Sequence, residues 1–184
     1  LKKLRNFTGI RGVPVPRQFK GTLRPYQHAG LNWFYFLQEF GFGGCLADDM
    51  GLGKTIQALV LLLNEKKRKV LATSLIIAPT SVVFNWQNEI ARFAPSLRVL
   101  THTGGERRRG TRAFQDYDVV LTTYGTLRRD IAFLKDFDFH YVILDESQNI
   151  KNAVSQTGKA ARLLRSAHRL ALSGTPLENS TTEL

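Results

Sequence analysis

Residues 48–55 read Asp48-Asp49-Met50-Gly51-Leu52-Gly53-Lys54-Thr55 and lie between a short apolar run and an amphipathic segment. A phosphate-binding loop needs glycines where backbone N–H groups curl around phosphate oxygens, a lysine for the β- and γ-phosphates, and a hydroxyl for magnesium. The stretch supplies all three in that order, and the amino terminus of the following helix would attract the same anion. Asp48 replaces the first glycine of the general pattern, so the stretch alone also fits an ordinary strand-to-helix turn.

Apolar runs and segments of helical spacing alternate on both sides of this loop. The apolar runs predict buried strands at 43–47, 74–78, 97–101, 118–122, 141–144 and 169–172. Helical spacing predicts helices at 25–39, 54–67, 81–93, 124–134 and 154–166. This alternation favours an α/β fold in which helices cover both faces of a parallel sheet. Because ligands of such sheets bind outside the carboxyl ends of the strands, we expect the chemically active residues just after each strand.

The run 141–144 ends in two adjacent carboxylates, Asp145 and Glu146. At a strand end, one carboxylate can orient magnesium through its water shell while the other polarises the attacking water. Acidic pairs also cap helices or lie in solvent. Following a phosphate-binding loop and an apolar strand, however, the pair is far more specific, and we predict a nucleoside triphosphate site built from both motifs.

Three other predicted strands end in hydroxyl-rich segments: Ala78-Pro79-Thr80-Ser81, Thr122-Thr123-Tyr124-Gly125 and Ser173-Gly174-Thr175-Pro176. Hydroxyls and helix amino termini on one rim of a sheet suit sugar–phosphate contacts, which position a nucleic acid without reading its sequence. Each segment taken singly is better explained as a capped turn, with Ser81 the N-cap of the helix that follows.

Composition and charge limit the class of protein. The chain has 184 residues, of which 43% are hydrophobic, enough for one domain with a buried core, and its net charge of +11 suits a polyanionic partner such as nucleic acid. Charge alone does not choose between DNA, RNA and anionic lipid. The single cysteine, Cys45, excludes an internal disulfide and fits a reducing compartment; we expect it in the core of a buried strand. No apolar run approaches the roughly 20 residues of a membrane helix.

The amino-terminal residues differ in composition from the rest. The first 38 residues contain seven cations and no acid, and proline and glycine interrupt any periodicity. We therefore expect a basic, extended arm at 1–22 and the α/β domain at 23–184. Because residue 1 is Leu1, we also expect the chain to be part of a longer protein.

Taken together, these motifs resemble the first RecA-like lobe of helicase superfamily two, most closely the Swi/Snf-type DNA-translocating ATPases. Leu23-Arg24-Pro25-Tyr26-Gln27 resembles the opening motif of that family, whose glutamine recognises adenine, and residues 48–55 are similar to its own form of motif I, in which an acid stands at the first glycine position. The resemblance implies a three-layer RecA-like P-loop fold with a central, mostly parallel sheet. It implies that ATP is bound by Gln27, Asp49, Met50, Gly51, Leu52, Gly53, Lys54, Thr55 and Gln148.

The resemblance also assigns chemical roles. Lys54, Asp145 and Glu146 would be catalytic, with Thr55 and Asp145 holding magnesium. Motif II reads Asp145-Glu146-Ser147-Gln148 where the family commonly has Asp-Glu-Ala-His, so Gln148 should keep the link to motif III without a titrating side chain. Ser173, Gly174 and Thr175 match motif III, which couples nucleotide state to DNA contact. Motifs Ia and Ib face DNA in the family and imply nucleic-acid contacts by Pro79, Thr80, Ser81, Trp86, Thr122, Thr123 and Tyr124.

The function implied is an ATP-binding lobe that, with a second RecA-like lobe, hydrolyses ATP and steps along double-stranded DNA. The second lobe of the family supplies arginine fingers, which are worth about 10³–10⁵ in rate, so the isolated chain should be nearly inactive. Two alternatives are a lobe of an RNA or DNA helicase from the same superfamily, and a non-catalytic nucleic-acid-binding module. We expect an intracellular protein with no membrane partner, located in the cytoplasm or nucleoid of a prokaryote or in the nucleus of a eukaryote.

Overall fold

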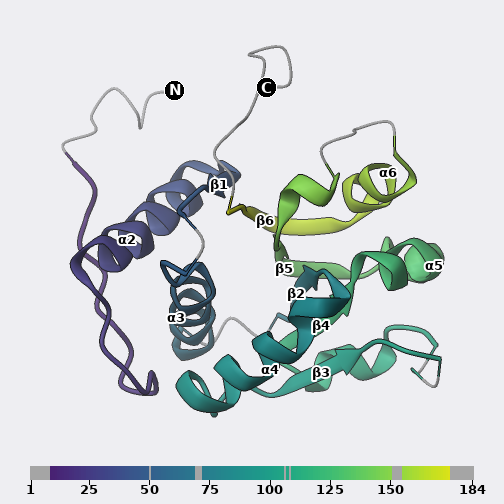
Figure 1. Ribbon diagram of the computed structural model, residues 1–184, viewed down its shortest axis with the longest axis horizontal. Coiled ribbons are helices and arrows are strands. Elements are labelled where there is room, and N and C mark those ends of the chain that lie inside the picture. Colours follow the sequence, from purple (N-terminus) through teal and green to yellow (C-terminus); the bar gives the residue numbers. More distant parts are fainter. Residues whose placement is uncertain are drawn as a thin grey trace.

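The computed structural model describes residues 9–49, 51–68, 72–105, 107, 109–150 and 155–174. Its helices and strands alternate as the sequence predicts (Figure 1). In chain order these elements are α2 (Pro25–Phe40), β1 (Gly44–Leu46), α3 (Lys54–Lys67), β2 (Ser74–Ala78), α4 (Thr80–Phe93), β3 (Val99–His102), β4 (Val119–Thr123), α5 (Tyr124–Leu134), β5 (Asp138–Leu144), α6 (Gln156–Leu163) and β6 (Arg165–Leu172). Short 3-10 helices lie at Arg112–Asp116 and Ser147–Ile150.

The sheet has six strands in the order β1-β6-β5-β2-β4-β3, and every neighbouring pair is parallel. The predicted parallel α/β fold is therefore confirmed. Two strands begin earlier than expected, because polar residues at their amino ends pair with each other: Asp138 of β5 lies opposite Arg165 of β6. An apolar-run criterion does not detect such residues.

Helices cover both faces of the sheet in separate layers (Figure 1). On one face, α2, α3 and α4 pack over alternate strand residues such as Ile76, Leu121 and Ile143. On the other face, α5 and α6 pack over the intervening residues, among them Ile77 and Val142. Successive strand residues point to opposite faces, so a strand buried on both sides is continuously apolar, as the sequence indicates.

Three local expectations are wrong. Helix α4 begins at Thr80 with Pro79 as its N-cap and no side-chain cap, so Ser81 already lies inside the helix and is not the N-cap. Helix α6 ends at Leu163 because the residues from Arg165 onward join β6. Cys45 is exposed: β1 is a three-residue edge strand in which Leu46 points into the core and Cys45 points away from it.

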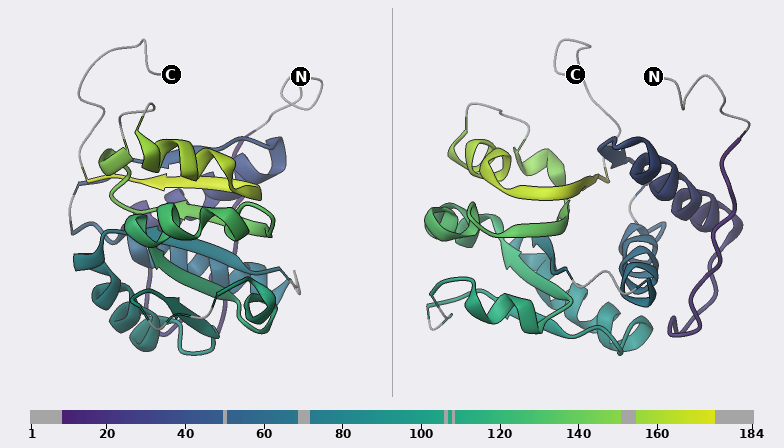
Figure 2. Two further views of the ribbon diagram at one scale, coloured as in Figure 1. Left: turned by 90° about the vertical axis from the view of Figure 1, so that its right-hand side faces the viewer. Right: turned by 180° about the vertical axis from the view of Figure 1, so that it is seen from behind.

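The described part of the basic arm lies against the helices. Figure 2 shows it running along α2 and past α3. Val13 N donates to Asn32 Oδ1 of α2 at 2.8 Å, Asn64 Nδ2 of α3 donates to the Pro14 carbonyl at 3.1 Å, and Phe19 is buried in the core. The arm is thus extended but held by the lobe, and the boundary at residue 22 stays a prediction.

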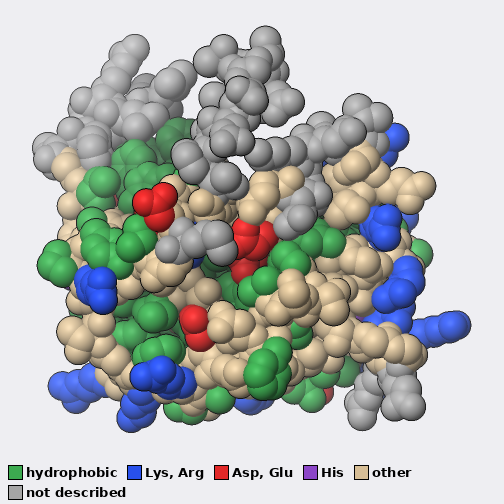
Figure 3. Space-filling model, viewed as in Figure 1, with side chains coloured by type: hydrophobic (Ala, Val, Ile, Leu, Met, Phe, Trp, Pro, Cys, Tyr) green, Lys and Arg blue, Asp and Glu red, His purple; other side chains and the backbone are tan. Residues whose placement is uncertain are grey.

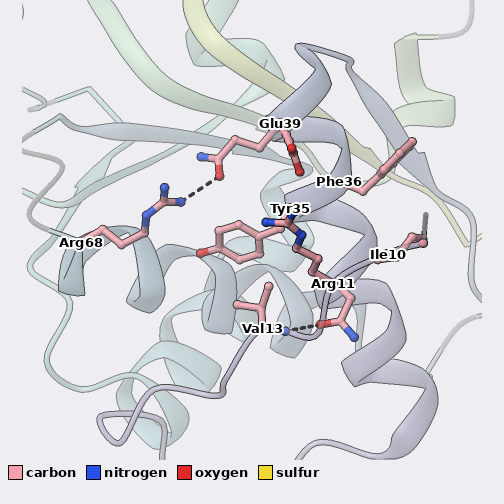
Figure 4. Close-up of a pocket in the computed structure, with 10 residues that line it drawn as sticks. Ile10, Arg11, Val13, Tyr35, Phe36, Glu39 and Arg68 are labelled. Atoms are coloured by element: carbon pink, nitrogen blue, oxygen red, sulfur yellow. Dashed lines mark hydrogen bonds between the residues drawn. The ribbon is translucent and has the colours of Figure 1, made fainter. Parts of the chain in front are cut away.

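Between the arm and α2 lies a pocket of about 400 Å³ that includes Arg11, Tyr35 and Arg68 (Figure 4). Arg68 caps the carboxyl end of α3, whereas the phosphate-binding loop precedes its amino end, about 20 Å away along the helix. This pocket is therefore not the predicted nucleotide site. No helix in the described ranges is long and apolar enough to cross a bilayer.

Candidate nucleotide-binding site

The loop that follows β1 and the acidic pair that follows β5 lie at the same edge of the sheet. Both strands flank β6, and Cys45 of β1 and Leu144 of β5 pair with the same residue, Ala171. The chain therefore leaves both strands at one level, roughly 10 Å apart across the single intervening strand. Lys54 is close enough for its charge to act on the carboxyl of Asp145. The two motifs that the sequence predicts to share a triphosphate thus lie side by side.

The phosphate-binding loop turns at two glycines that adopt left-handed conformations, Gly51 (φ 83°) and Gly53 (φ 79°). Residues with a Cβ rarely adopt this conformation, so the loop depends on glycine at both positions. Lys54 begins α3 and is buried; its Nζ donates to the carbonyls of Asp48 at 2.7 Å and Asp49 at 3.0 Å. A phosphate bound in this loop would replace these carbonyls as the hydrogen-bond acceptor of Nζ.

Helix α2 holds the loop from the other side. Gln27 Nε2 and the Tyr26 hydroxyl each donate to the Leu52 carbonyl at 3.0 Å, and Gln27 Oε1 accepts from the backbone N–H of Arg24 at 2.9 Å. A Cβ at Gly53 would lie 2.5 Å from Gln27 Nε2, which is a second reason for glycine at this position. The structure brings Gln27 to the loop, and its contact with adenine stays a prediction. Tyr26 is an additional loop contact that the sequence argument did not identify.

Asp145 is a buried carboxylate, 6% exposed, with two hydrogen-bond donors. Oδ2 accepts from Trp86 Nε1 at 2.7 Å and Oδ1 accepts from the backbone N–H of Glu146 at 2.9 Å. Burial raises the pKa of the Asp145 carboxyl, whereas the bonds from Trp86 and Glu146 and the charge of Lys54 lower it; burial outweighs them.

Trp86 does not face nucleic acid. Its side chain is fully buried between α4 and the sheet, and its indole N–H is directed to Asp145. The expected nucleic-acid contact by Trp86 is therefore wrong. Thr122 is likewise fully buried, with its hydroxyl donating to the His102 carbonyl at 2.7 Å, so a direct contact by Thr122 is wrong as well. Both side chains point into a layer of the fold rather than toward the edge at which the strands end.

The second acid of the pair is held in an unusual backbone conformation. Glu146 has φ 49°, the sole described non-glycine residue with positive φ, and strain of this kind concentrates at functional sites. Gln148 Nε2 donates to Glu146 Oε2, and the Ser173 hydroxyl donates to Gln148 Oε1 at 3.0 Å. The hydrogen-bonded link expected between motif II and motif III is present, while its coupling role stays a prediction.

The remaining predicted residues lie along the same edge. Ala78 of β2 pairs with Thr123 of β4, so the segments that follow these strands leave the sheet together. Thr80 and Ser81 are exposed there, next to half-buried Pro79. Thr123 caps α5 by accepting from the Thr126 N–H at 3.1 Å. Gly174 follows Ser173 at the end of β6, and Met50 and Thr175 lie outside the described residues.

Tyr124 connects this edge with the acidic pair. Its hydroxyl donates to the Asp145 carbonyl at 2.7 Å. Burial, with the nearby charges of Asp145 and Glu146, raises the pKa of Tyr124, so it remains a neutral donor. The segment predicted to meet nucleic acid is thereby bonded directly to the segment predicted to bind the metal.

The donor set at this edge fits magnesium. Mg²⁺ prefers hard oxygen ligands and keeps several waters. An ionised carboxylate has about four acceptor positions, of which Asp145 uses two for Trp86 and Glu146. Thr55, in the first turn of α3 and half-buried, supplies the hydroxyl. Asp145 and Thr55 would therefore hold the ion, which when bound would neutralise charge on the phosphates.

Comparisons with known proteins agree with this geometry. Residues 26–184 match the family described as SNF2-related domain. The chain is 49% identical to the putative ATP-dependent helicase/translocase YwqA of Bacillus subtilis, over 98% of this chain and 20% of that protein. It is 42% identical to helicase swr1 of Emericella nidulans, over 94% of this chain and 10% of that protein. The SWI2/SNF2 ATPase core of Sulfolobus solfataricus in complex with dsDNA superimposes with a TM-score of 0.85 at 43% identity, over 95% of this chain and 36% of that chain. The chain spans a fifth or less of these two curated relatives.

Proposed function

The chain belongs to the SNF2-related domain family, and from this premise we propose that it is the ATP-binding lobe of a Swi/Snf-type DNA translocase. The observation that carries the proposal is the placement of Lys54 and Asp145 on either side of β6 at one edge of the sheet. A loop that binds the phosphates and a carboxylate that binds magnesium must meet at the γ-phosphate, and this register brings them together.

The residues of the site divide the work of ATP hydrolysis. Lys54 exchanges its loop carbonyls for phosphate oxygens, Gln27 recognises adenine, and Thr55 with Asp145 holds magnesium. Glu146, kept in place by its hydrogen bond with Gln148, orients and deprotonates the attacking water. Ser173 lies at the end of β6, where motif III begins, and is linked to Glu146 through Gln148. This link couples motif III to the state of Glu146.

Double-stranded DNA is the proposed partner of the neighbouring edge. Thr80 and Ser81 at the amino terminus of α4 offer exposed hydroxyls and backbone N–H groups, which bind phosphates without reading sequence. The solved relative named above is itself described as a complex with dsDNA, which supports duplex DNA over RNA for this chain. A second RecA-like lobe would close over the same edge and complete the catalytic site.

The test is ATP hydrolysis by the full-length protein with and without duplex DNA. Lys54→Ala should reduce DNA-stimulated turnover at least about 10²-fold by removing a charge that stabilises the transferring phosphoryl group. Lys67→Ala is the matched control, because Lys67 is exposed at the opposite end of the same helix. Unchanged turnover in Lys54→Ala would reject the proposed role, and stimulation by RNA in place of DNA would favour an RNA helicase.

A further inference from the structure

Gln57 lies in the first turn of α3, directly after the phosphate-binding loop, and its side chain is fully buried. Its Nε2 donates a hydrogen bond to Asp48 Oδ2 at 3.1 Å. Because an ionised carboxylate only accepts hydrogen bonds, the amide nitrogen is the atom that faces Asp48. Gln57 thereby connects Asp48, the first residue of the loop, to α3, the helix that follows the loop.

The other half of the amide is enclosed by α2. Gln57 Oε1 is buried and has no hydrogen-bond partner within the described residues. A Cβ built on Gly30 of α2 would lie only 1.9 Å from this oxygen. Buried amide oxygens are normally hydrogen-bonded, so an unpartnered Oε1 is unusual. The bond from Nε2 to Asp48 fixes one end of the Gln57 amide, and the space above Gly30 accommodates the other end.

The partner of Gln57 is a charge that the general phosphate-loop pattern lacks, because Asp48 stands where that pattern has glycine. Lys54 Nζ bonds the backbone carbonyl of Asp48 at 2.7 Å, and no ion pair joins the two side chains in the described part of the protein. An Asp48 carboxylate free to rotate would compete for Lys54 and repel a phosphate nearby. The Gln57 amide instead holds it toward the interface of α2 and α3.

We infer that Gln57 is a positioning residue for nucleotide binding, which directs the Asp48 carboxylate away from Lys54 and the phosphates. Gly30 is the second part of this device, because only a residue without a Cβ leaves room for the Gln57 amide in this orientation. The inference rests on the proposed function, since it concerns the same nucleotide site, but neither Gln57 nor Gly30 touches the nucleotide in this scheme.

Gln57→Leu in the full-length protein tests the hydrogen bond. Loss of a hydrogen bond to a charged group should raise KM for ATP about tenfold. The value of kcat should change less than about twofold, because the interaction acts on binding rather than on the transition state alone. The melting temperature should not fall, because the substitution also removes the unpartnered oxygen.

Two further variants separate positioning from packing. In the Asp48→Gly background, which restores the glycine of the general pattern, Gln57→Leu should change KM less than about twofold, because no carboxylate remains to be held. Gly30→Ala should reproduce the higher KM by displacing the amide, even though alanine favours the helical conformation of α2.

The outcomes distinguish this inference from the proposed function. If the unaltered protein hydrolyses ATP and Gln57→Leu leaves KM unchanged, the positioning role is rejected and the proposed function stands. An equal rise of KM on adding Gln57→Leu to the unaltered protein and to the Asp48→Gly variant would show a packing effect and would also reject the positioning role. Failure of the unaltered protein to bind ATP would overturn both.

Discussion

At the scale of single residues, the state of Asp145 depends on a side chain distant in sequence. Burial favours its protonated form, yet binding of magnesium needs the charged form. The N–H of Trp86 is the donor of the 2.7 Å bond that opposes burial, and it belongs to α4 rather than to the motif that contains Asp145. Trp86 therefore belongs to the proposed magnesium site through its bond to Asp145.

Trp86→Phe retains most of the ring volume and removes this donor. Because the lost bond favoured the charged carboxylate, the pKa of Asp145 should rise further, and the acidic limb of kcat against pH should move up by about one pH unit. The measurement is the pH dependence of ATP hydrolysis by the full-length protein. Trp33→Phe, in α2, is the control and should leave that limb in place.

At the scale of elements, one carboxylate joins two helices to the sheet. Glu65, in the last turn of α3, accepts hydrogen bonds from Tyr35 at 2.9 Å and Gln38 at 3.0 Å in α2, and from His140 in β5 at 2.7 Å. Burial raises the pKa of the Glu65 carboxyl, but the bonds from His140, Tyr35 and Gln38 and the charge of Arg68 outweigh it and lower the pKa to about 2. Because α2 also clamps the phosphate-binding loop, this cluster fixes the helix that carries Gln27.

The depressed pKa predicts how stability depends on pH. A carboxyl with a pKa of 4.5 when unfolded and about 2 when folded stabilises the protein above pH 4.5, and this contribution is lost as pH falls from 4.5 towards 2. It amounts to about 3 kcal/mol. Denaturant unfolding of Glu65→Gln at pH 7 should show a loss of that size and a weaker decline between pH 5 and pH 3. Exposed Glu39→Gln is the control, and an equal effect there would contradict the assignment.

At the scale of the whole molecule, positive side chains outnumber negative ones. The chain carries +11, and Figure 3 shows Lys and Arg side chains along the border of one face with acidic side chains nearer its middle. Separate lysines and arginines can each neutralise one phosphate. Such a surface therefore suits a long polyanion, which presents many phosphates along its length.

Affinity for duplex DNA should therefore fall steeply with added salt. Each neutralised phosphate releases counterions and contributes about −0.9 to the slope of log affinity against log salt concentration. Titration of a labelled duplex with the full-length protein at several salt concentrations measures this slope. A slope near zero would show that the charge serves another purpose.

How much of this structure could be predicted from the sequence differs between backbone and side chains. Helices α3 and α5 have the predicted ends, and the strands lie within a few residues of the apolar runs, because local periodicity reflects burial on one face or on both. The phosphate-binding loop and the acidic pair are contiguous motifs, and since parallel strands end at one edge, the α/β pattern placed both motifs at that edge. Their separation by a single strand depends on the strand order, which the pattern does not contain.

The partners of individual side chains were decided only by packing between distant elements. Trp86 meets Asp145 across 59 positions, and Cys45 is exposed because β1 lies at the edge of the sheet. Gln57 is a polar residue directly before the buried apolar run 58–63, and this contrast is visible in the sequence. Its bond to Asp48 and the space above Gly30, however, exist only because α2 packs on α3. The physical reason is that a side chain's burial and hydrogen bonds depend on which helix or strand covers it, and no pattern local to the chain contains that information.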